Sequence, residues 1–125
     1  MANKLNWFEI PVTDMERAKR FYEALTGAAL TRSPFGQPGE EMCVFDAEQE
    51  TDIKGALFKT EAMKPSTDGS VVYLNAAPAI DAWLERVESA GGKVLIPKVT
   101  LPEGMGYFAH IQDSEGNRVG IHAMA

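Results

Sequence analysis

The sequence predicts an α+β fold in which one β-α-β-β-β pattern occurs twice. Two helical patterns, at residues 14–27 and 78–91, have the same length, and each stops at a glycine ahead of a strand. One strand pattern precedes each helix and three follow it. A repeated unit of this kind divides the 125 residues into halves near 1–62 and 68–125, which together form a single domain.

The first strand, residues 5–12, alternates between two sets of side chains. Phe8 and Ile10 belong to a uniformly apolar set, which we expect to face the helices. Trp7 and Glu9 belong to the other set, which then faces whatever the opposite side of the sheet encloses. The sequence therefore places one carboxylate on the face where a ligand could lie.

The first helix begins with a capping-box pattern, in which Thr13 caps the helix and Glu16 reaches back. Gly27 ends this helix. We expect three short strands after it, at about residues 28–33, 41–47 and 53–59.

The second half repeats this order. A strand at residues 70–75 leads to a helix in which Pro78 occupies the first turn. A further strand covers about residues 93–99. The half ends in a hairpin, because two apolar-rich runs flank a cluster of turn-forming residues at 113–117. Both histidines of the protein lie on this hairpin, at positions 110 and 122.

Composition narrows the class of protein. A formal net charge of −6 argues against nucleic acid or an anionic membrane as partner. No apolar run is long enough to span a bilayer, and the N-terminus has no hydrophobic signal core. The single cysteine, Cys43, excludes an intramolecular disulfide and favours a cytoplasmic location. The expected partners are a small molecule and a second copy of the chain.

Three segments carry a resemblance to a known family. They are residues 12–22, with a Phe-Tyr pair ahead of Gly27, the Gly91-Gly92 helix stop, and the turn Asp113-Ser114-Glu115-Gly116-Asn117. Together they resemble the glyoxalase, bleomycin-resistance and extradiol-dioxygenase superfamily, whose members are also called vicinal oxygen chelate proteins. The resemblance implies that the two modules curl into a cup-shaped mixed sheet around a pocket. It also implies a homodimer, often with pockets built from both subunits.

The same resemblance implies where a metal would be bound. Metal-dependent members place one ligand on the first strand and one on the last strand of each module. In this sequence those positions fall at Trp7, within the run 55–58, near Val72, and at Gly120. None of these side chains offers an oxygen or nitrogen donor suited to zinc, nickel or iron. We therefore predict that the usual metal site is missing and that no cofactor is bound.

Glu9 and His122 are the candidate catalytic residues. Glu9 would act as a general base or accept a hydrogen bond from a ligand; alternatively it is a solvated or salt-bridged carboxylate at the sheet edge. His122 shares the face of Gly120 and could contact substrate or transfer a proton. Alternatively, His122 finishes its strand or contacts a partner subunit. His110 faces inward if Asp113 pairs with Asn117, and a one-residue slip would turn it outward.

Aromatic side chains supply the predicted wall of the pocket or part of the core. Planar or apolar ligands suit such walls. Cys43 is more simply interpreted as a small buried hydrophobe than as a nucleophile, because no basic residue lies near it in sequence. The aromatic candidates are Trp7, Phe58, Tyr107 and Phe108.

The function predicted from these observations is binding of a small apolar or aromatic molecule. The ligand would lie between Trp7 and Phe58, with Glu9 and His122 fixing its polar end. One alternative is a divalent-metal lyase, isomerase or dioxygenase that uses a displaced site made of Glu9, His110 and His122. Another is metal-free acid–base catalysis by Glu9 with His122.

Overall fold

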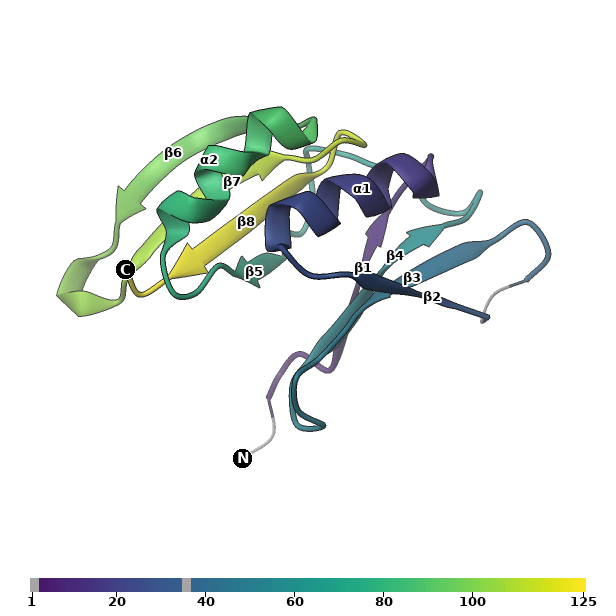
Figure 1. Ribbon diagram of the computed structural model, residues 1–125, viewed down its shortest axis with the longest axis horizontal. Helices are drawn as coiled ribbons and strands as arrows, with labels where there is room; N and C mark the ends of the chain where they lie inside the picture. Colours follow the sequence, from purple (N-terminus) through teal and green to yellow (C-terminus); the bar gives the residue numbers. More distant parts are fainter. Residues whose placement is uncertain (1–2, 35–36) are drawn as a thin grey trace.

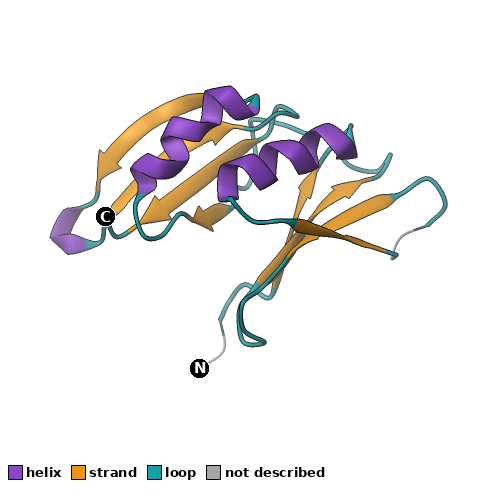
Figure 2. Ribbon diagram, in the orientation of Figure 1, coloured by secondary structure: helices purple, strands orange, loops and turns teal. Residues whose placement is uncertain are grey.

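The computed structural model describes residues 3–34 and 37–125. Within these ranges the chain forms two four-stranded mixed sheets, and one helix packs on each sheet (Figures 1 and 2). The predicted α+β class is therefore confirmed. None of the helices in the described part of the chain is long and apolar enough to cross a bilayer.

The two halves of the chain contain matching elements. The first sheet consists of β1 (Trp7–Pro11), β2 (Leu30–Ser33), β3 (Glu41–Phe45) and β4 (Lys54–Lys59), with helix α1 (Met15–Thr26). The second consists of β5 (Tyr73–Asn75), β6 (Lys93–Thr100), β7 (Tyr107–Gln112) and β8 (Arg118–Ala123), with helix α2 (Ile80–Ala90). A 3₁₀ turn, η1 (Pro102–Gly104), lies between β6 and β7.

The strand order is the same in both sheets. It is β1-β4-β3-β2 in the first and β5-β8-β7-β6 in the second. In each sheet the opening strand pairs in parallel with the last strand, and the other pairs are antiparallel. The crossover helix between the first and second strands of each half makes this parallel pairing possible. β1 and β5 consequently lie at the edges of their sheets.

The beginning of α1 differs from the sequence prediction. Asp14, rather than Thr13, is the N-cap residue, and its carboxylate accepts a hydrogen bond of 3.0 Å from the Arg17 backbone N–H. Glu16 does not reach back to the cap; its carboxylate pairs with Arg32. The hydroxyl of Thr13 instead donates to Glu115, from the other half of the chain, which also accepts the backbone N–H of Thr13.

The beginning of α2 also differs. Ala79 is the N-cap residue, so Pro78 lies before the helix and not in its first turn. The backbone at Ala79 is still extended, with φ −141° and ψ 133°. The first helical N–H, from Ile80, donates to the carbonyl of Ala125. The strand predicted at residues 70–75 is shorter than expected and forms only at 73–75.

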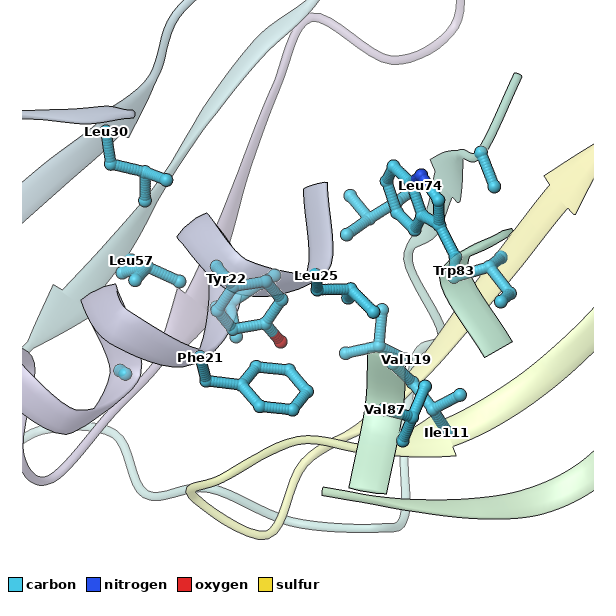
Figure 3. Close-up of a cluster of buried hydrophobic side chains, with 14 of the residues drawn as sticks. Phe21, Tyr22, Leu25, Leu30, Leu57, Leu74, Trp83, Val87, Ile111 and Val119 are labelled. Atoms are coloured by element: carbon cyan, nitrogen blue, oxygen red, sulfur yellow. The ribbon is translucent and has the colours of Figure 1, made fainter. Parts of the chain in front are cut away.

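The two helices pack against one another and against their own sheets (Figure 3). Phe21, Tyr22 and Leu25 of α1 are completely buried, and the rings of Phe21 and Tyr22 meet edge to face with centroids 4.9 Å apart. From α2, Ile80 and Val87 enter the same core. One hydrophobic core thus fixes the two halves relative to each other.

A polar contact joins the halves at the turn between β7 and β8. Glu115 accepts the backbone N–H groups of Thr13 and Asp14 at 2.9 and 2.8 Å. Its other oxygen accepts Arg17 Nε at 2.6 Å, and its side chain is fully buried. Asn117 donates to the carbonyl of Pro11 at 2.7 Å. The turn between β7 and β8 therefore holds the start of the first helix and the segment that leads into it.

Two further groups complete this contact. The hydroxyl of Tyr22, on the buried face of α1, donates to Asp113 at 2.5 Å. Asp113 also accepts the backbone N–H groups of Glu115 and Asn117, each at 2.9 Å. The carboxylate of Asp113 thus shapes the turn while it holds α1. We call Asp113, Glu115 and Asn117 the capping turn; its partners on α1 are Arg17 and Tyr22.

Glu115 has an unusual acidity for a glutamate. Burial by itself would raise its pKa, but hydrogen bonds from Arg17 and from the backbone of Asp14 and Thr13 outweigh burial and lower the pKa to about 2. A carboxylate whose pKa is lower in the folded chain than its ordinary value of 4.5 stabilises the fold above that value. This stability is lost as the pH falls from 4.5 towards 2.

We expect Glu115→Gln to lower the free energy of unfolding at pH 7 by about 1 to 2 kcal/mol, after allowance for screening at half-exposed Arg17. The same variant should lose part of the decline in stability between pH 4.5 and 2. Urea unfolding across this pH range measures both effects. Glu61→Gln, at an exposed loop position, is the control. Equal stability of wild type and Glu115→Gln at pH 7 would contradict this role.

Candidate functional site

The register of the terminal hairpin places both histidines on one face. The backbone N–H of Asp113 donates to the carbonyl of Asn117, and His110 lies opposite Gly120. His122 lies between Phe108 on β7 and Asn75 on β5. The alternate residues of β7 and β8 belong to the hydrophobic core. Both histidines therefore face away from the helices, as the Asp113–Asn117 pairing predicted for His110.

Gly120 makes room for an aromatic ring from the neighbouring strand. Tyr73 of β5 is its paired residue, and the tyrosine ring lies across the position where a side chain at 120 would be. A Cβ added to Gly120 would lie only 2.4 Å from a carbon of that ring. The absence of a side chain at 120 is thus a condition for the observed position of Tyr73.

Tyr73 joins a chain of three polar side chains across the open face. Its hydroxyl is 2.6 Å from His110 Nε2, and Arg118 lies 3.0 Å from His110 Nδ1. The rings of Tyr73, Phe108 and His110 also contact one another, with centroids 5.4 to 6.3 Å apart. Burial lowers the pKa of His110, and the positive charge of Arg118 lowers it further.

His122 lies beside this group, in the wall of a pocket. Its Nε2 donates to the carbonyl of Met105 at 2.8 Å. This contact attaches β8 to the loop that follows η1. The pocket has a volume of about 540 Å³ and a mainly apolar wall. Its lining residues are Tyr73, Leu74, Asn75, Leu101, Phe108 and His122.

Glu9 lies elsewhere. It is exposed, and Trp7 Nε1 donates to its carboxylate at 3.2 Å. It lines a separate, smaller hollow of about 140 Å³, together with Lys64 and Arg118. The structure therefore does not bring Glu9 and His122 into one pocket of the same chain.

The four aromatic candidates are divided between the two sheets. Phe58 pairs with Pro11, and Pro11 lies on the same face of β1 as Trp7. Trp7 and Phe58 therefore share the helix-free face of the first sheet. Phe108 alone lines the pocket of the second sheet. Tyr107 instead packs against the hydrophobic core. The ammonium of Lys98 lies 4.3 Å from the centre of the Tyr107 ring. The face of Tyr107 is thus opposite to that of Phe108.

The three pocket residues of β5, Tyr73, Leu74 and Asn75, were absent from the sequence candidates. The alternation of Val72 and Leu74 with Tyr73 and Asn75 was a signal that the latter pair shares one face. The sequence did not show that β5 pairs with β8, and this pairing places Tyr73 against Gly120. The sequence-based site therefore lacked its central aromatic residue.

The positions at which the family resemblance implies metal ligands do not suit a metal. Trp7 is 40% exposed and carries an indole that donates but does not coordinate. The space at Gly120 is filled by the ring of Tyr73, and that at Gly55 by the ring of Phe8. Across residues 3–34 and 37–125, no three His, Cys, Asp or Glu side chains gather in a way that could hold a metal ion.

Comparison with known proteins identifies the family. Residues 4–121 match the Glyoxalase/Bleomycin resistance protein/Dioxygenase superfamily. The chain belongs to this superfamily. A glyoxylase-like domain-containing protein from Didymella fabae is 31% identical over 123 residues, which are 97% of this chain and 94% of that protein.

Solved structures of other proteins share the fold. A glyoxalase-related enzyme from Fulvimarina pelagi has a TM-score of 0.67 and 19% sequence identity, with 98% of this chain and 88% of that chain covered. A fosfomycin resistance protein from Listeria monocytogenes has a TM-score of 0.65 and 14% identity, with 98% and 92% covered. At these identities the likeness shows the fold alone.

Cys43 is fully buried in β3. Burial raises the pKa of its thiol, so the reactive thiolate is disfavoured in the folded chain. It packs in the hydrophobic core with Leu57, the residue opposite it on β4. These surroundings fit a small buried hydrophobe and not a nucleophile.

Proposed function

We propose that this chain binds a small apolar or aromatic molecule in the pocket between β5, β7 and β8. The observation that carries the proposal is the 540 Å³ pocket with a mainly apolar wall and a few polar groups at its edge. Pockets that bind small molecules commonly combine an apolar wall with a small number of placed polar groups. Leu101 and Phe108 would contact the body of the ligand.

The polar groups of this pocket come from two neighbouring strands. Asn75 Oδ1 accepts the backbone N–H of Ala77, which fixes the amide and leaves its NH₂ as a donor. His122 Nε2 is engaged by the Met105 carbonyl, so Nδ1 of a neutral ring is an acceptor. The pocket thus offers both a donor and an acceptor to the polar end of a ligand.

A wider hollow of about 830 Å³ lies between the two halves and shares Tyr73, Leu74 and Asn75 with the pocket. Its wall includes Phe8 and Phe45, but also polar and acidic residues of the loop between β3 and β4. We favour the smaller pocket for an apolar ligand because its wall is more uniformly apolar.

We further propose that binding does not use the superfamily's metal site. Two of the expected ligand positions support this: the ring of Tyr73 takes the space of a side chain at Gly120, and the indole of Trp7 donates but does not coordinate. The alternative enzyme would need Glu9 together with His110 and His122, which lie on different sheets of one chain. A second chain would have to supply Glu9 for that displaced site to form. We also propose a cytoplasmic location, which the single buried thiol of Cys43 supports.

Metal analysis separates these two functions. We expect less than one tenth of an equivalent per chain, an order-of-magnitude limit for a site without donors, after untagged protein is exposed to nickel, zinc, manganese and ferrous iron. Inductively coupled plasma mass spectrometry after gel filtration gives the amount bound. About one equivalent per chain, lost in His122→Ala, would overturn the metal-free proposal and support the displaced site.

Truncation of the pocket wall tests the binding proposal. We expect Phe108→Ala to weaken the binding of toluene, the neutral probe, by about tenfold, because a large apolar contact is lost. Ligand-observed NMR titration measures the affinity. Phe58→Ala, on the first sheet, is the matched control and should leave the affinity unchanged. If Phe58→Ala weakened binding and Phe108→Ala did not, the ligand would lie on the first sheet.

We propose that a second copy of the chain covers the helix-free faces. Large apolar side chains are exposed on both: Trp7 on the first sheet is 40% exposed, and Tyr73 on the second is 50% exposed. Leu5 and Ile53 are exposed near Trp7, at the end of the sheet where Trp7 pairs with Lys54. Exposed apolar groups gathered in this way are typical of a protein interface.

Sedimentation velocity tests the homodimer. We expect wild type to sediment as a dimer at micromolar concentration, and Trp7→Glu to shift it to the monomer, because an unpaired charge would enter the interface. Ala24→Glu places the same charge on the exposed surface of α1 and should leave the dimer intact. A monomeric wild type would contradict the proposal.

A further inference from the structure

The hydrogen-bond chain Arg118–His110–Tyr73 has a direction that the chemistry of its members determines. A guanidinium has only donors, so the contact of 3.0 Å requires His110 Nδ1 to accept. A ring whose Nδ1 accepts carries its proton on Nε2 and is neutral. Nε2–H therefore donates to Tyr73 Oη across 2.6 Å. The hydroxyl oxygen of Tyr73 is the acceptor in this pair.

This direction leaves the hydroxyl proton of Tyr73 available. Within the described residues, Tyr73 Oη has no hydrogen-bond partner besides His110. Tyr73 is also half exposed and lines the pocket. Its O–H group is therefore a donor without an acceptor in this chain, in the wall of a site that is otherwise mainly apolar.

Arg118 is itself held in position. Its Nε donates to the carbonyl of Thr67 at 3.1 Å, and its backbone N–H donates to the carbonyl of Ser66. These contacts come from the segment that connects the two halves. Burial and the charge of Arg118 both lower the pKa of His110, which agrees with a neutral imidazole ring. The chain of donors thus starts from a fixed positive charge.

Hydrogen bonds in series polarise one another. A cation at the start makes the imidazole N–H a stronger donor, and this in turn makes the phenol O–H a stronger donor. Such a donor binds a negatively charged oxygen better than a neutral one, since charge-assisted hydrogen bonds are the stronger kind. The hydrogen bonds from Arg118 to His110 and from His110 to Tyr73 therefore make the hydroxyl of Tyr73 a strong donor.

We propose that Tyr73 donates its hydroxyl hydrogen bond to an anionic oxygen, a carboxylate or an enolate, of an aromatic or apolar ligand in the pocket. Arg118 and His110 are positioning residues that fix and polarise Tyr73. Gly120 is part of the same device, because any side chain there would displace the ring. This inference rests on the proposed binding function and adds the chemical class of the ligand's polar end.

The first test needs no ligand. Long-range ¹H–¹⁵N NMR of the full chain reports which nitrogen of His110 carries the proton. We expect the Nε2–H form in wild type, and a mixture of both forms in Arg118→Met, where nothing requires Nδ1 to accept. An Nδ1–H form in wild type would reverse the hydrogen bond to Tyr73 and overturn the proposal. A pure Nε2–H form in Arg118→Met would show that Arg118 does not position the ring.

The second test compares phenylacetate with its neutral analogue phenylacetamide. We expect wild type to prefer the carboxylate by about tenfold, the size of one hydrogen bond to a charged group. Tyr73→Phe should abolish that preference, because it weakens phenylacetate by more than it weakens phenylacetamide, whose neutral carbonyl gains less from the hydroxyl donor. Tyr107→Phe, whose ring packs on the opposite face of β7, is the matched control and should keep the preference.

The outcomes separate this inference from the binding proposal. Equal binding of both probes by wild type and Tyr73→Phe would overturn the role of Tyr73 while binding in the pocket stands. If phenylacetate, phenylacetamide and toluene all failed to bind, the role of Tyr73 and the binding proposal would both be overturned. Arg118→Lys keeps the charge but not the fixed geometry of a guanidinium. We expect Arg118→Met to lose the preference for phenylacetate and Arg118→Lys to keep part of it, whereas a purely structural role predicts equal behaviour of the two variants.

Discussion

The arrangement of the two halves depends on the buried carboxylate of Glu115, together with the hydrophobic core that the two helices share. The carboxylate satisfies two backbone N–H groups at the start of α1, a place where a helix otherwise leaves donors unpaired. Negative charge at a helix N-terminus is also favoured by the helix dipole. Since Glu115 belongs to the turn between β7 and β8, the hairpin that carries both histidines is attached directly to the first half. The hydrophobic core between α1 and α2 supplies the buried apolar area that joins the two halves. The directional hydrogen bonds of Glu115 fix how the terminal hairpin lies against α1.

The pocket side of the second sheet is defined by the pairing of Gly120 with Tyr73. At the position where the resemblance implies a metal ligand, the chain has Gly120, and the ring of Tyr73 fills the space. The polar atoms of this face come instead from His110, Arg118 and the hydroxyl of Tyr73. The missing side chain at 120 thus leaves room for the ring of its paired residue.

The sequence was sufficient for features set by local pattern. The glycine stop at Gly27, the hairpin turn and the face of His110 all follow from residue spacing and from the pairing of Asp113 with Asn117. Features set by distant contacts could not be read in this way. Thr13 has the residue type of a cap, but Glu115 accepts its N–H from 102 positions away. Glu9 and His122 share the predicted orientation on their strands, yet the strands belong to different sheets.

The capping turn also has a consequence for the order in which the protein is synthesised and folds. The residues that complete the start of α1 leave the ribosome about a hundred positions after the helix itself. Contacts so distant in sequence form late, because the chain between them must first be ordered. Until the second half is synthesised, Asp14 can cap the helix, but the backbone N–H groups of Thr13 and Asp14 have only water as acceptor.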